Sequence, residues 1–253
     1  MPIGAVVHRP ERVASTNDAA RALALEGAEH GTAVLAGEQT RGRGTRGRTW
    51  HSPAGLGLYA SFVLRGPGGG PFPLLHLLPL AAGLAAADAV RAEAGIELRL
   101  KWPNDLVSDG KKLGGILCEG VSGGAGGDFA IVGVGVNVGH RPDDLPAEIR
   151  PCATSLRMEG AGRATVDGLF GGLCRALDCW YNALAGGDAA AVVRAFEARL
   201  AFPPGAPVRA LTAAGPVSGT CRGLDAEGRL VVERAGGAGT VVLDAVLELD
   251  GSP

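Results

Sequence analysis

Residues 111–138, KKLGGILCEGVSGGAGGDFAIVGVGVNV, alternate in a way that predicts two neighbouring strands joined by the glycine-rich turn SGGAGGD. Because side chains of a strand alternate between its faces, one face of the second strand consists of Val132, Val134, Val136 and Val138. The other face consists of Ile131, Gly133, Gly135 and Asn137. The valine face is typical of a sheet surface packed on a core. Interior glycines indicate the close approach of either a ligand or a packed helix, and the sequence leaves both open.

Around this hairpin the chain alternates between strand-like and helix-like segments. Further strands are predicted at 32–39, 55–64 and 96–107, and helices at 14–27, 74–94, 166–185 and 188–200. The segment 65–73, RGPGGGPFP, is predicted to be a loop. These patterns predict an α+β fold in which a mixed sheet packs against helices.

A second, smaller unit is predicted at the carboxyl end of the chain. The stretch FPPGAP, residues 202–207, has the composition of a linker, and short strands separated by glycine-rich turns follow it. We therefore predict a main domain at 1–203 and a small β-barrel domain at 204–253. A unit of this size is close to the lower limit for independent folding, so we expect it to pack against the main domain.

Bulk composition excludes several classes of protein. The chain has 253 residues and a formal net charge of −2, which argues against a general nucleic-acid or membrane-surface binder. Its most apolar run, within 74–94, is shorter than the ~20 apolar residues of a membrane span and indicates a buried helix. The five cysteines are odd in number and lack CxxC spacing. This predicts reduced, mostly buried thiols in a cytoplasm.

The stretch QTRGRGTRGRTW, residues 39–50, concentrates positive charge on a flexible backbone. It holds four arginines and three glycines between Arg41 and Arg48. Arginines that converge with backbone N–H groups suit polyanions, because the guanidinium binds phosphate or carboxylate bidentately. The loop is not a P-loop, which requires GxxxxGK[ST]. A small-molecule phosphate and a nucleic-acid backbone both remain possible ligands on this evidence.

A cluster of charged residues in KWPNDLVSDGKKL, residues 101–113, is a candidate for catalysis. Lys101, Asp105 and Lys112 lie within a dozen residues, around a turn fixed by Pro103. A lysine can neutralise charge that develops on a phosphoryl oxygen, and an aspartate can hold Mg²⁺ or accept a proton. Lys111 is interpreted as a solvated side chain.

Five short motifs in one order carry a resemblance to a known family. The strings STN, QTRGRGTRGRTW, KWPNDL, KKLGGIL and GVGVNV make the chain, from about residue 13 onward, similar to biotin protein ligases. The resemblance implies the class II synthetase-like fold of biotin and lipoate ligases, followed by an SH3-like barrel. It also implies an enzyme that makes biotinyl-5′-adenylate from biotin and ATP with Mg²⁺. Biotin would then pass to one lysine of a biotin carboxyl carrier protein.

The resemblance also implies where the ligands bind. The implied biotin pocket consists of Ser15, Thr16, Asn17, Gln39, Gly42, Arg43, Lys112 and Gly115. The implied nucleotide site consists of Arg46, Arg48, Trp50, Asn104, Gly133, Gly135 and Asn137. With the charged cluster, the catalytic candidates are Arg43, Lys101, Asp105 and Lys112, of which Asp105 is the candidate Mg²⁺ ligand. The arginine loop is then interpreted as a lid over the adenylate. His51 is the one histidine expected near the nucleotide.

The chain departs from the family pattern in two ways. The usual loop reads GRGRxGRxW, and Thr45 stands where its second arginine would be. We expect looser retention of the adenylate as a result. Only about a dozen residues precede the similar region, too few for the DNA-binding module that some family members carry. A monofunctional ligase without sequence-specific DNA binding is therefore expected.

Two other functions and one assembly remain open on the sequence. A lipoate- or octanoate-attaching ligase of the same fold is the nearest alternative, although GRGxxGRxW and KWPND favour biotin. A nucleic-acid-binding module that uses the arginine loop is disfavoured by the net charge of −2. A homodimer is possible, paired through an edge strand such as 129–138 or through the C-terminal domain.

Overall fold

A seven-stranded mixed sheet forms the centre of the protein, which is described from a computed structural model over residues 1–66, 74–122, 127–237 and 239–251. The strand order is β1-β3-β5-β9-β8-β7-β6, and only the β1–β3 pair is parallel. The strands are β1 (Val7–His8), β3 (Ala33–Ala36), β5 (Gly57–Arg65), β6 (Arg99–Lys101), β7 (Asp105–Ser108), β8 (Lys111–Val121) and β9 (Phe129–Asn137). A two-stranded parallel ladder, β2 (Arg12–Val13) with β4 (Glu38–Gln39), lies beside it.

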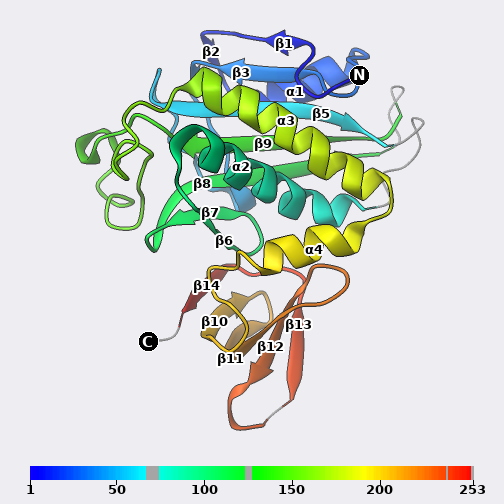
Figure 1. The fold of residues 1–253 in the computed structure, drawn as a ribbon, viewed down its shortest axis with the longest axis vertical. Helices are drawn as coiled ribbons and strands as arrows, with labels where there is room; N and C mark the ends of the chain where they lie inside the picture. The colour runs from blue at the N-terminus through cyan, green and yellow to red at the C-terminus, as the bar shows by residue number, and fades with distance from the viewer. Residues whose placement is uncertain (67–73, 123–126, 238, 252–253) are drawn as a thin grey trace.

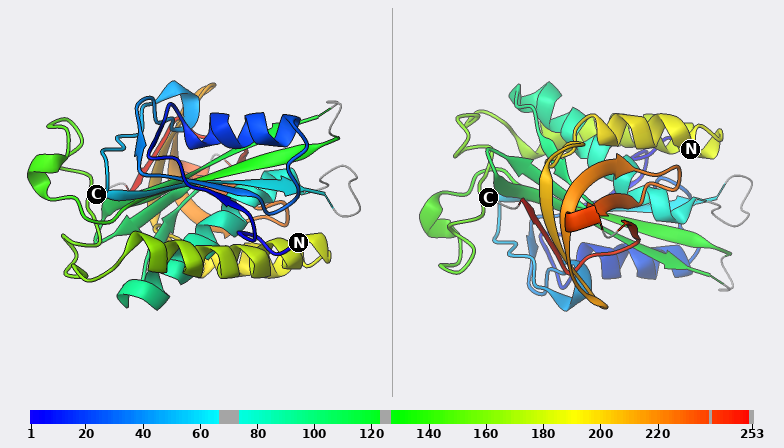
Figure 2. Two further views of the ribbon diagram at one scale, coloured as in Figure 1. Left: turned by 90° about the horizontal axis from the view of Figure 1, so that it is seen from above. Right: turned by 90° about the horizontal axis from the view of Figure 1, so that it is seen from below.

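Helices cover both faces of this sheet, as predicted for an α+β fold. Helix α1 (Thr16–Leu25) lies on one face, and α2 (Leu78–Ala94) and α3 (Val166–Ala185) lie on the other (Figures 1 and 2). Helix α4 (Ala189–Glu197) packs on α2 and α3 and ends next to the C-terminal strands. The helix boundaries predicted for 166–185 agree with α3.

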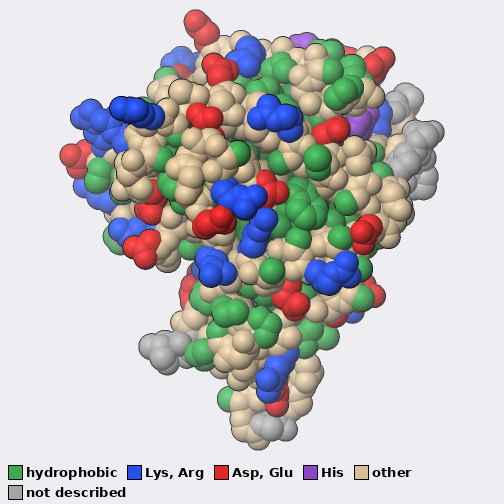
Figure 3. All heavy atoms as spheres, viewed as in Figure 1, with side chains coloured by type: hydrophobic (Ala, Val, Ile, Leu, Met, Phe, Trp, Pro, Cys, Tyr) green, Lys and Arg blue, Asp and Glu red, His purple; other side chains and the backbone are tan. Residues whose placement is uncertain are grey.

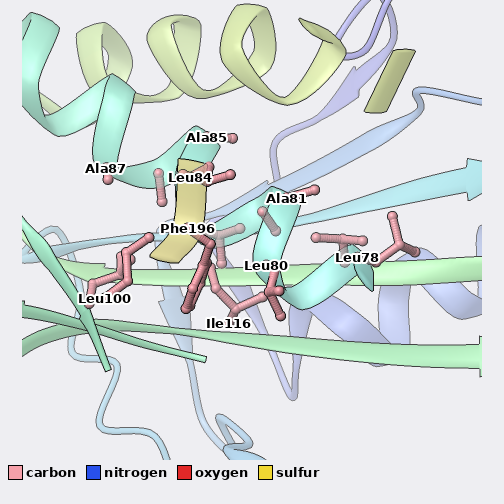
Figure 4. Packing of buried hydrophobic residues seen from close by; sticks show 14 of the residues in the cluster. Leu78, Leu80, Ala81, Leu84, Ala85, Ala87, Leu100, Ile116 and Phe196 are labelled. Carbon is pink, nitrogen blue, oxygen red and sulfur yellow. The ribbon is translucent and has the colours of Figure 1, made fainter. Parts of the chain in front are cut away.

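The predicted valine face of β9 is confirmed as a core face. Its four valines are at most 6 % exposed and belong to the main hydrophobic cluster, together with the helices α2 and α3. Figure 4 shows the packing of α2 in this cluster, where Leu80 and Leu84 lie near Phe196 of α4, Leu100 of β6 and Ile116 of β8. On the other face, Ile131 packs in a smaller cluster with the alanines of α1. The alternation of residues along β9 therefore predicted correctly that its two faces pack in different clusters.

The apolar run within 74–94 forms a short 3₁₀ turn (Leu75–Leu77) followed by α2, with Pro79 in its first turn. By length and composition alone, Leu75–Ala94 is one helical stretch able to cross a membrane, but 67 % of its most apolar window is buried inside the protein. This agrees with the prediction of a buried helix. The loop predicted at 65–73 falls mostly outside the described residues.

The C-terminal strands form an open antiparallel sheet, not the closed barrel predicted from the sequence. Its order is β13-β12-β11-β10-β14, and among the described residues β13 and β14 do not pair with each other. The strands are β10 (Pro207–Thr212), β11 (Gly215–Leu224), β12 (Leu230–Arg234), β13 (Thr240–Leu243) and β14 (Glu248–Gly251). A 3₁₀ turn, Ala235–Gly237, links β12 to β13.

The physical reason for the open sheet is its position against helices α2 and α4. Its buried residues, among them Val208, Leu230 and Leu249, belong to the same hydrophobic cluster as α2 and β9, so the sheet is buried by the rest of the chain and does not close on itself. Trp102, 4 % exposed, donates its indole N–H to the carbonyl of Gly228 at 2.9 Å across this contact. The boundary at 203/204 stays a prediction.

Two further expectations need correction. Strand β9 is not an edge strand, because it pairs with β5 on one side and β8 on the other, so it offers no free edge for a second chain. The five cysteines are unpaired, but they are not mostly buried: Cys174 and Cys221 are buried, Cys118 is half-buried, and Cys152 and Cys179 are exposed.

Candidate functional site

A pocket of about 540 Å³ opens beside the glycine-bearing face of β8 and β9. Its walls come from the start of α1, the arginine loop, the turn before β7, the segment 145–153 and the segment 246–250. Every site residue predicted from the sequence lines this pocket except Gly42. Gly42 is buried and packs closely on the backbone of Trp50, since a Cβ there would lie 2.4 Å from the Trp50 carbonyl oxygen. The sequence thus predicted one site, and the fold assembles it from segments far apart in the chain.

One end of the pocket is polar and buried. Ser15, Thr16 and Asn17 at the start of α1 are only 3–4 % exposed. Thr16 donates its backbone N–H to Oε1 of Gln39 at 2.8 Å, and its hydroxyl lies 3.0 Å from the same atom. Ser15 is the N-cap residue by backbone position, but its side chain makes no capping bond. Ser15 therefore lines the pocket with a hydroxyl that is not used in capping the helix.

The glycines of β9 make room for two side chains of the pocket. A Cβ at Gly133 would lie 2.1 Å from Oδ1 of Asn17, and a Cβ at Gly135 would lie 2.6 Å from Nε1 of Trp50. Real Cβ atoms do not approach so closely, so a larger residue at either position would displace the side chain that lies there. Of the two interpretations left open by the sequence, the packed helix applies at Gly133, because Asn17 belongs to α1; Gly135 instead meets the indole of Trp50 from the arginine loop. Trp50 Nε1 is buried and has no hydrogen-bond partner among the described residues, which leaves a free donor at the site.

The arginine loop folds into a compact turn over the pocket. Arg43 and Thr49 form an antiparallel bridge that encloses a 3₁₀ turn, Thr45–Gly47. Arg46 adopts a left-handed backbone (φ 59°), which is costly for a residue with a side chain and recurs at functional sites. In the described part of the chain the Arg46 side chain makes no ion pair, and it is exposed. Arg41 is likewise exposed and makes no ion pair among the described residues, so these two are the unpaired cations of the loop.

Two other arginines of the loop, Arg43 and Arg48, already have partners. Arg43 forms ion pairs with Glu119 of β8 and Asp18 of α1, at 2.8 Å each. Arg48 donates to the carbonyl oxygen of Leu247 at 2.9 Å, and so joins the loop to the C-terminal segment. The loop is therefore anchored at both ends to other walls of the pocket.

The charged cluster predicted around Pro103 is split in the structure. Lys112 Nζ lies 2.6 Å from Asp105 Oδ1 and 5.6 Å from the centre of the Trp50 ring, inside the pocket. Lys101 instead pairs with Asp250 of β14, 3.0 Å away. Lys111 is exposed, as predicted. Lys112 and Asp105 thus form the candidate catalytic pair. Lys101 also lines the pocket, but it is held by the C-terminal sheet.

Two asparagines hold the pocket walls with their amide nitrogens. Asn104 donates to the carbonyl oxygen of Ile116 at 3.0 Å, and Asn137 donates to that of Thr154 at 2.9 Å. Both line the pocket. Because an amide oxygen accepts hydrogen bonds, the Oδ1 atoms of these residues suit hydrogen-bond donors of a ligand.

Two segments that line the pocket, and the hydrogen-bonding residue Glu119, were not predicted from the sequence. The segment 145–153, which includes Cys152, and the segment 246–250 line the pocket without any motif that marks them. Glu119 was also missed, although the period of two places it on the same face of β8 as Gly115 and Leu117. That alternation was the one available signal.

Charge on the opposite side of the molecule shows no single-sign field. Figure 3, seen from the side of α2 and α3, shows Lys and Arg side chains interspersed with Asp and Glu side chains. A nucleic-acid-binding face requires cations gathered in one patch or stripe. This face does not supply one.

A buried histidine next to the pocket makes stability depend on pH. His140 is 0 % exposed, and neither ring nitrogen has a hydrogen-bond partner of normal geometry among the described residues. Its ring centre lies 6.2 Å from that of His51, which lines the pocket and contacts the carbonyl oxygen of Asp144. Burial first, and the neighbouring His51 second, lower the pKa of His140 to about 4.

We expect the free energy of unfolding to fall as the pH is lowered from about 6.5 to about 4. In this window the unfolded chain binds a proton at His140 that the folded chain does not, which is worth up to about 3 kcal/mol. His140→Phe should remove this part of the pH dependence in denaturant titrations, whereas His76→Gln, at an exposed site, should leave it unchanged. Equal losses of stability in the wild type and His140→Phe would contradict the assignment. Burial also lowers the pKa of His30, so a smaller slope remains.

Comparisons with known proteins agree on one family. The model of the biotin/lipoate A/B protein ligase family matches residues 10–137, and that of the biotin protein ligase C terminal domain matches residues 205–246. The biotin–[acetyl-CoA-carboxylase] ligase of Paracoccus denitrificans is 37 % identical, over 92 % of this chain and 96 % of that protein. The enzyme of the same name from Mycobacterium tuberculosis is 35 % identical, over 91 % and 84 %. A solved biotin protein ligase from Aquifex aeolicus in complex with biotin and ATP superposes with a TM-score of 0.83 at 29 % identity, over 98 % and 100 %.

Proposed function

Because this chain belongs to the biotin/lipoate A/B protein ligase family, we propose that its pocket joins biotin and ATP as biotinyl-5′-adenylate and passes biotin to a lysine of a carrier protein. One observation carries the proposal: the same pocket holds a buried polar end, at Ser15, Thr16 and Asn17, and a cationic end, at Lys112 beside Trp50. The polar end suits the head of the acid. The cationic, aromatic end suits its carboxylate and a nucleotide.

The polar end favours biotin over lipoate. The ureido ring of biotin carries N–H donors and a carbonyl acceptor, whereas the dithiolane of lipoate has none of these. A pocket end built from two buried hydroxyls and two amides would leave those groups unpaired against lipoate, at a cost of about 1–3 kcal/mol for each buried group. The experiment is a competition: pyrophosphate release with biotin, lipoate and octanoate, each alone and then mixed. Preference for lipoate or octanoate would assign the alternative function.

The charges of the pocket suit the adenylation step. A carboxylate and a triphosphate repel each other, so bringing the acid to the α-phosphorus requires cations on both sides of the reacting atoms. We assign Lys112 to the carboxylate of the acid and to an oxygen of the α-phosphate, whose phosphorus the carboxylate attacks as pyrophosphate leaves. Arg46, which has no ion pair among the described residues, is assigned to the phosphates, and Trp50 to the adenine. Asn104 and Asn137 would accept from the nucleotide through their Oδ1 atoms.

Asp105 is the proposed Mg²⁺ ligand. Its Oδ1 atom is held by Lys112 at 2.6 Å, so one carboxylate oxygen remains for an ion. That fits Mg²⁺, which binds to one or two carboxylates together with substrate phosphates and waters. When bound, the ion would neutralise phosphate charge. No group of three or more His, Cys, Asp or Glu side chains able to hold a metal occurs among the residues described.

The arginine loop is assigned the role of a lid, because a mixed anhydride must be kept from water. Thr45 lines the pocket at the position of the missing arginine. We expect Thr45→Arg to slow the release of biotinyl-adenylate about fivefold to tenfold, by one added charge-assisted hydrogen bond. The rate is measured by chasing the preformed complex with unlabelled substrates. Thr45→Gln, which introduces a long side chain without a charge, should change the release rate little. An unchanged release rate in Thr45→Arg would remove Thr45 from the description of the lid.

The acceptor is a biotin carboxyl carrier protein, as the names of the relatives imply. We infer a cytoplasmic enzyme organised as a catalytic part, 1–203, and a C-terminal part, 204–253. A homodimer stays a prediction. Strands β13 and β14 are the ends of the C-terminal sheet and would be available for pairing, which sedimentation at several concentrations would test.

A further inference from the structure

Glu119 on β8 joins two parts of the site that are far apart in the sequence. Its side chain is 25 % exposed, and both carboxylate oxygens are used. Arg43 donates to Oε1 at 3.0 Å and to Oε2 at 2.8 Å, in a two-pronged contact. Asn17 donates its amide nitrogen to Oε2 at 2.7 Å. One carboxylate thus receives three hydrogen bonds, two of which involve charges on both partners.

Each partner of Glu119 controls one part of the pocket. Asn17 lies over Gly133 at the start of α1, and its Oδ1 accepts from Ser61 at 2.6 Å. The turn of the arginine loop begins at Arg43, which forms a backbone bridge with Thr49. The carboxylate therefore ties the acid-binding end of the pocket to the base of the lid.

A carboxylate is suited to this place because it only accepts hydrogen bonds. Facing Glu119, the amide of Asn17 must present its NH₂, so its oxygen turns toward the hydroxyl of Ser61. Ser61 in turn lies 2.8 Å from the hydroxyl of Thr16. Glu119 thereby fixes the direction of the hydrogen bonds that end at the pocket wall.

The second carboxylate on Arg43 differs in kind. Asp18 is 54 % exposed, meets Arg43 through one oxygen at 2.8 Å, and has no other hydrogen-bond or ion-pair partner among the described residues. Exposed single contacts contribute little, whereas partly buried two-pronged arginine–carboxylate contacts are strong. Asp18 is therefore a matched control: it shares the arginine but lacks the link to Asn17.

We propose that Glu119 is a positioning residue that holds Asn17 and the base of the arginine loop in the geometry that binds the acid substrate. The acid is biotin, so this part rests on the proposed function. Glu119 is not among the residues that line the pocket. It acts through Asn17 on the polar end of the pocket and through Arg43 on the lid.

The first test is kinetic and uses Glu119→Gln, which keeps the shape but not the charge. We expect KM for biotin to rise roughly tenfold or more, with KM for ATP within about twofold and a smaller fall in kcat. Asp18→Asn should leave all three within about twofold, and Glu119→Asp should recover part of the loss. In an Asn17→Ala background, Glu119→Gln should add less than its single effect, because the two residues act as one unit. Equal increases in both KM values, or additive effects, would overturn the positioning role.

A second test is independent of biotin chemistry. Trypsin is added to the ligand-free proteins, and cleavage after Arg46 and Arg48 is followed by mass spectrometry. Glu119→Gln should be cut in this loop several-fold faster than wild type, whereas Asp18→Asn should not; cleavage rates follow the population of the opened loop. Unchanged cleavage in Glu119→Gln would remove the link to the lid. A wild type without biotin-dependent activity, combined with faster cleavage of Glu119→Gln, would refute the proposed function and leave the link standing.

Discussion

Replacing Lys112 with alanine is expected to lower the rate of biotin-dependent pyrophosphate release by a hundredfold or more. The ammonium lies 2.6 Å from Asp105 and 5.6 Å from the centre of the Trp50 ring, where the carboxylate of the acid and the α-phosphate would meet. Loss of a positioned cation at a developing charge costs about 2.7 kcal/mol or more, which corresponds to that factor. The effect should appear in kcat, because the charge develops in the transition state.

The neighbouring lysine provides the control for this change. Lys111 is exposed and is not among the residues that line the pocket, so Lys111→Ala should keep nearly full activity. Asp105→Asn should also lower the rate of pyrophosphate release, since it removes the partner of Lys112 and the proposed Mg²⁺ ligand. Similar rates for Lys111→Ala and Lys112→Ala would show that charge near the pocket, and not the placement of Lys112, supports the reaction.

A methyl group at Gly133 should damage acid binding more than the same change elsewhere on the strand. The new Cβ would lie 2.1 Å from Oδ1 of Asn17, which Ser61 holds at 2.6 Å, so the asparagine must move or the strand must bend. We expect KM for biotin to rise about thirtyfold or more, which corresponds to about 2 kcal/mol. The measurement is a titration of biotin at saturating ATP.

Two other glycines of this region make the comparison specific. Gly135→Ala would place a Cβ 2.6 Å from the indole nitrogen of Trp50, so KM for ATP should rise instead of KM for biotin. At Gly139 the nearest atom is 3.6 Å away, an ordinary contact, and Gly139→Ala should change neither value by more than about twofold. Equal effects of all three substitutions on both substrates would point to general damage of the sheet.

Local patterns predicted the layers of the fold because they depend on nearest neighbours along the chain. The valines of β9 and the boundaries of α3 follow from periods of 2 and 3.6 residues. The order of strands does not follow from them: β9 looked like an edge and is central, since its partner β5 is some seventy residues away in the sequence. The C-terminal sheet stays open for a similar reason, because it packs against a surface that its own sequence does not encode.

For the site, too, some features could be predicted from local sequence and others could not. Motifs identified the segments that carry Thr16, Arg43 and Lys112, and the fold brings them to one pocket. The partners of these residues were not predictable: Lys101 meets Asp250, 149 residues away, and Arg48 meets the backbone of Leu247. Such contacts depend on how two sheets pack, and no short-range pattern records that.

The most direct measurement is to incubate the purified protein with biotin, ATP and Mg²⁺ and to look for biotinyl-5′-adenylate by mass spectrometry, with lipoate and octanoate in parallel reactions. We expect the biotin adduct to accumulate, to require ATP, and to disappear when a biotin carboxyl carrier domain is added, as the domain gains the mass of biotin. Adenylate formed from lipoate or octanoate but not from biotin, or none formed from any of the three acids, would contradict the proposed function.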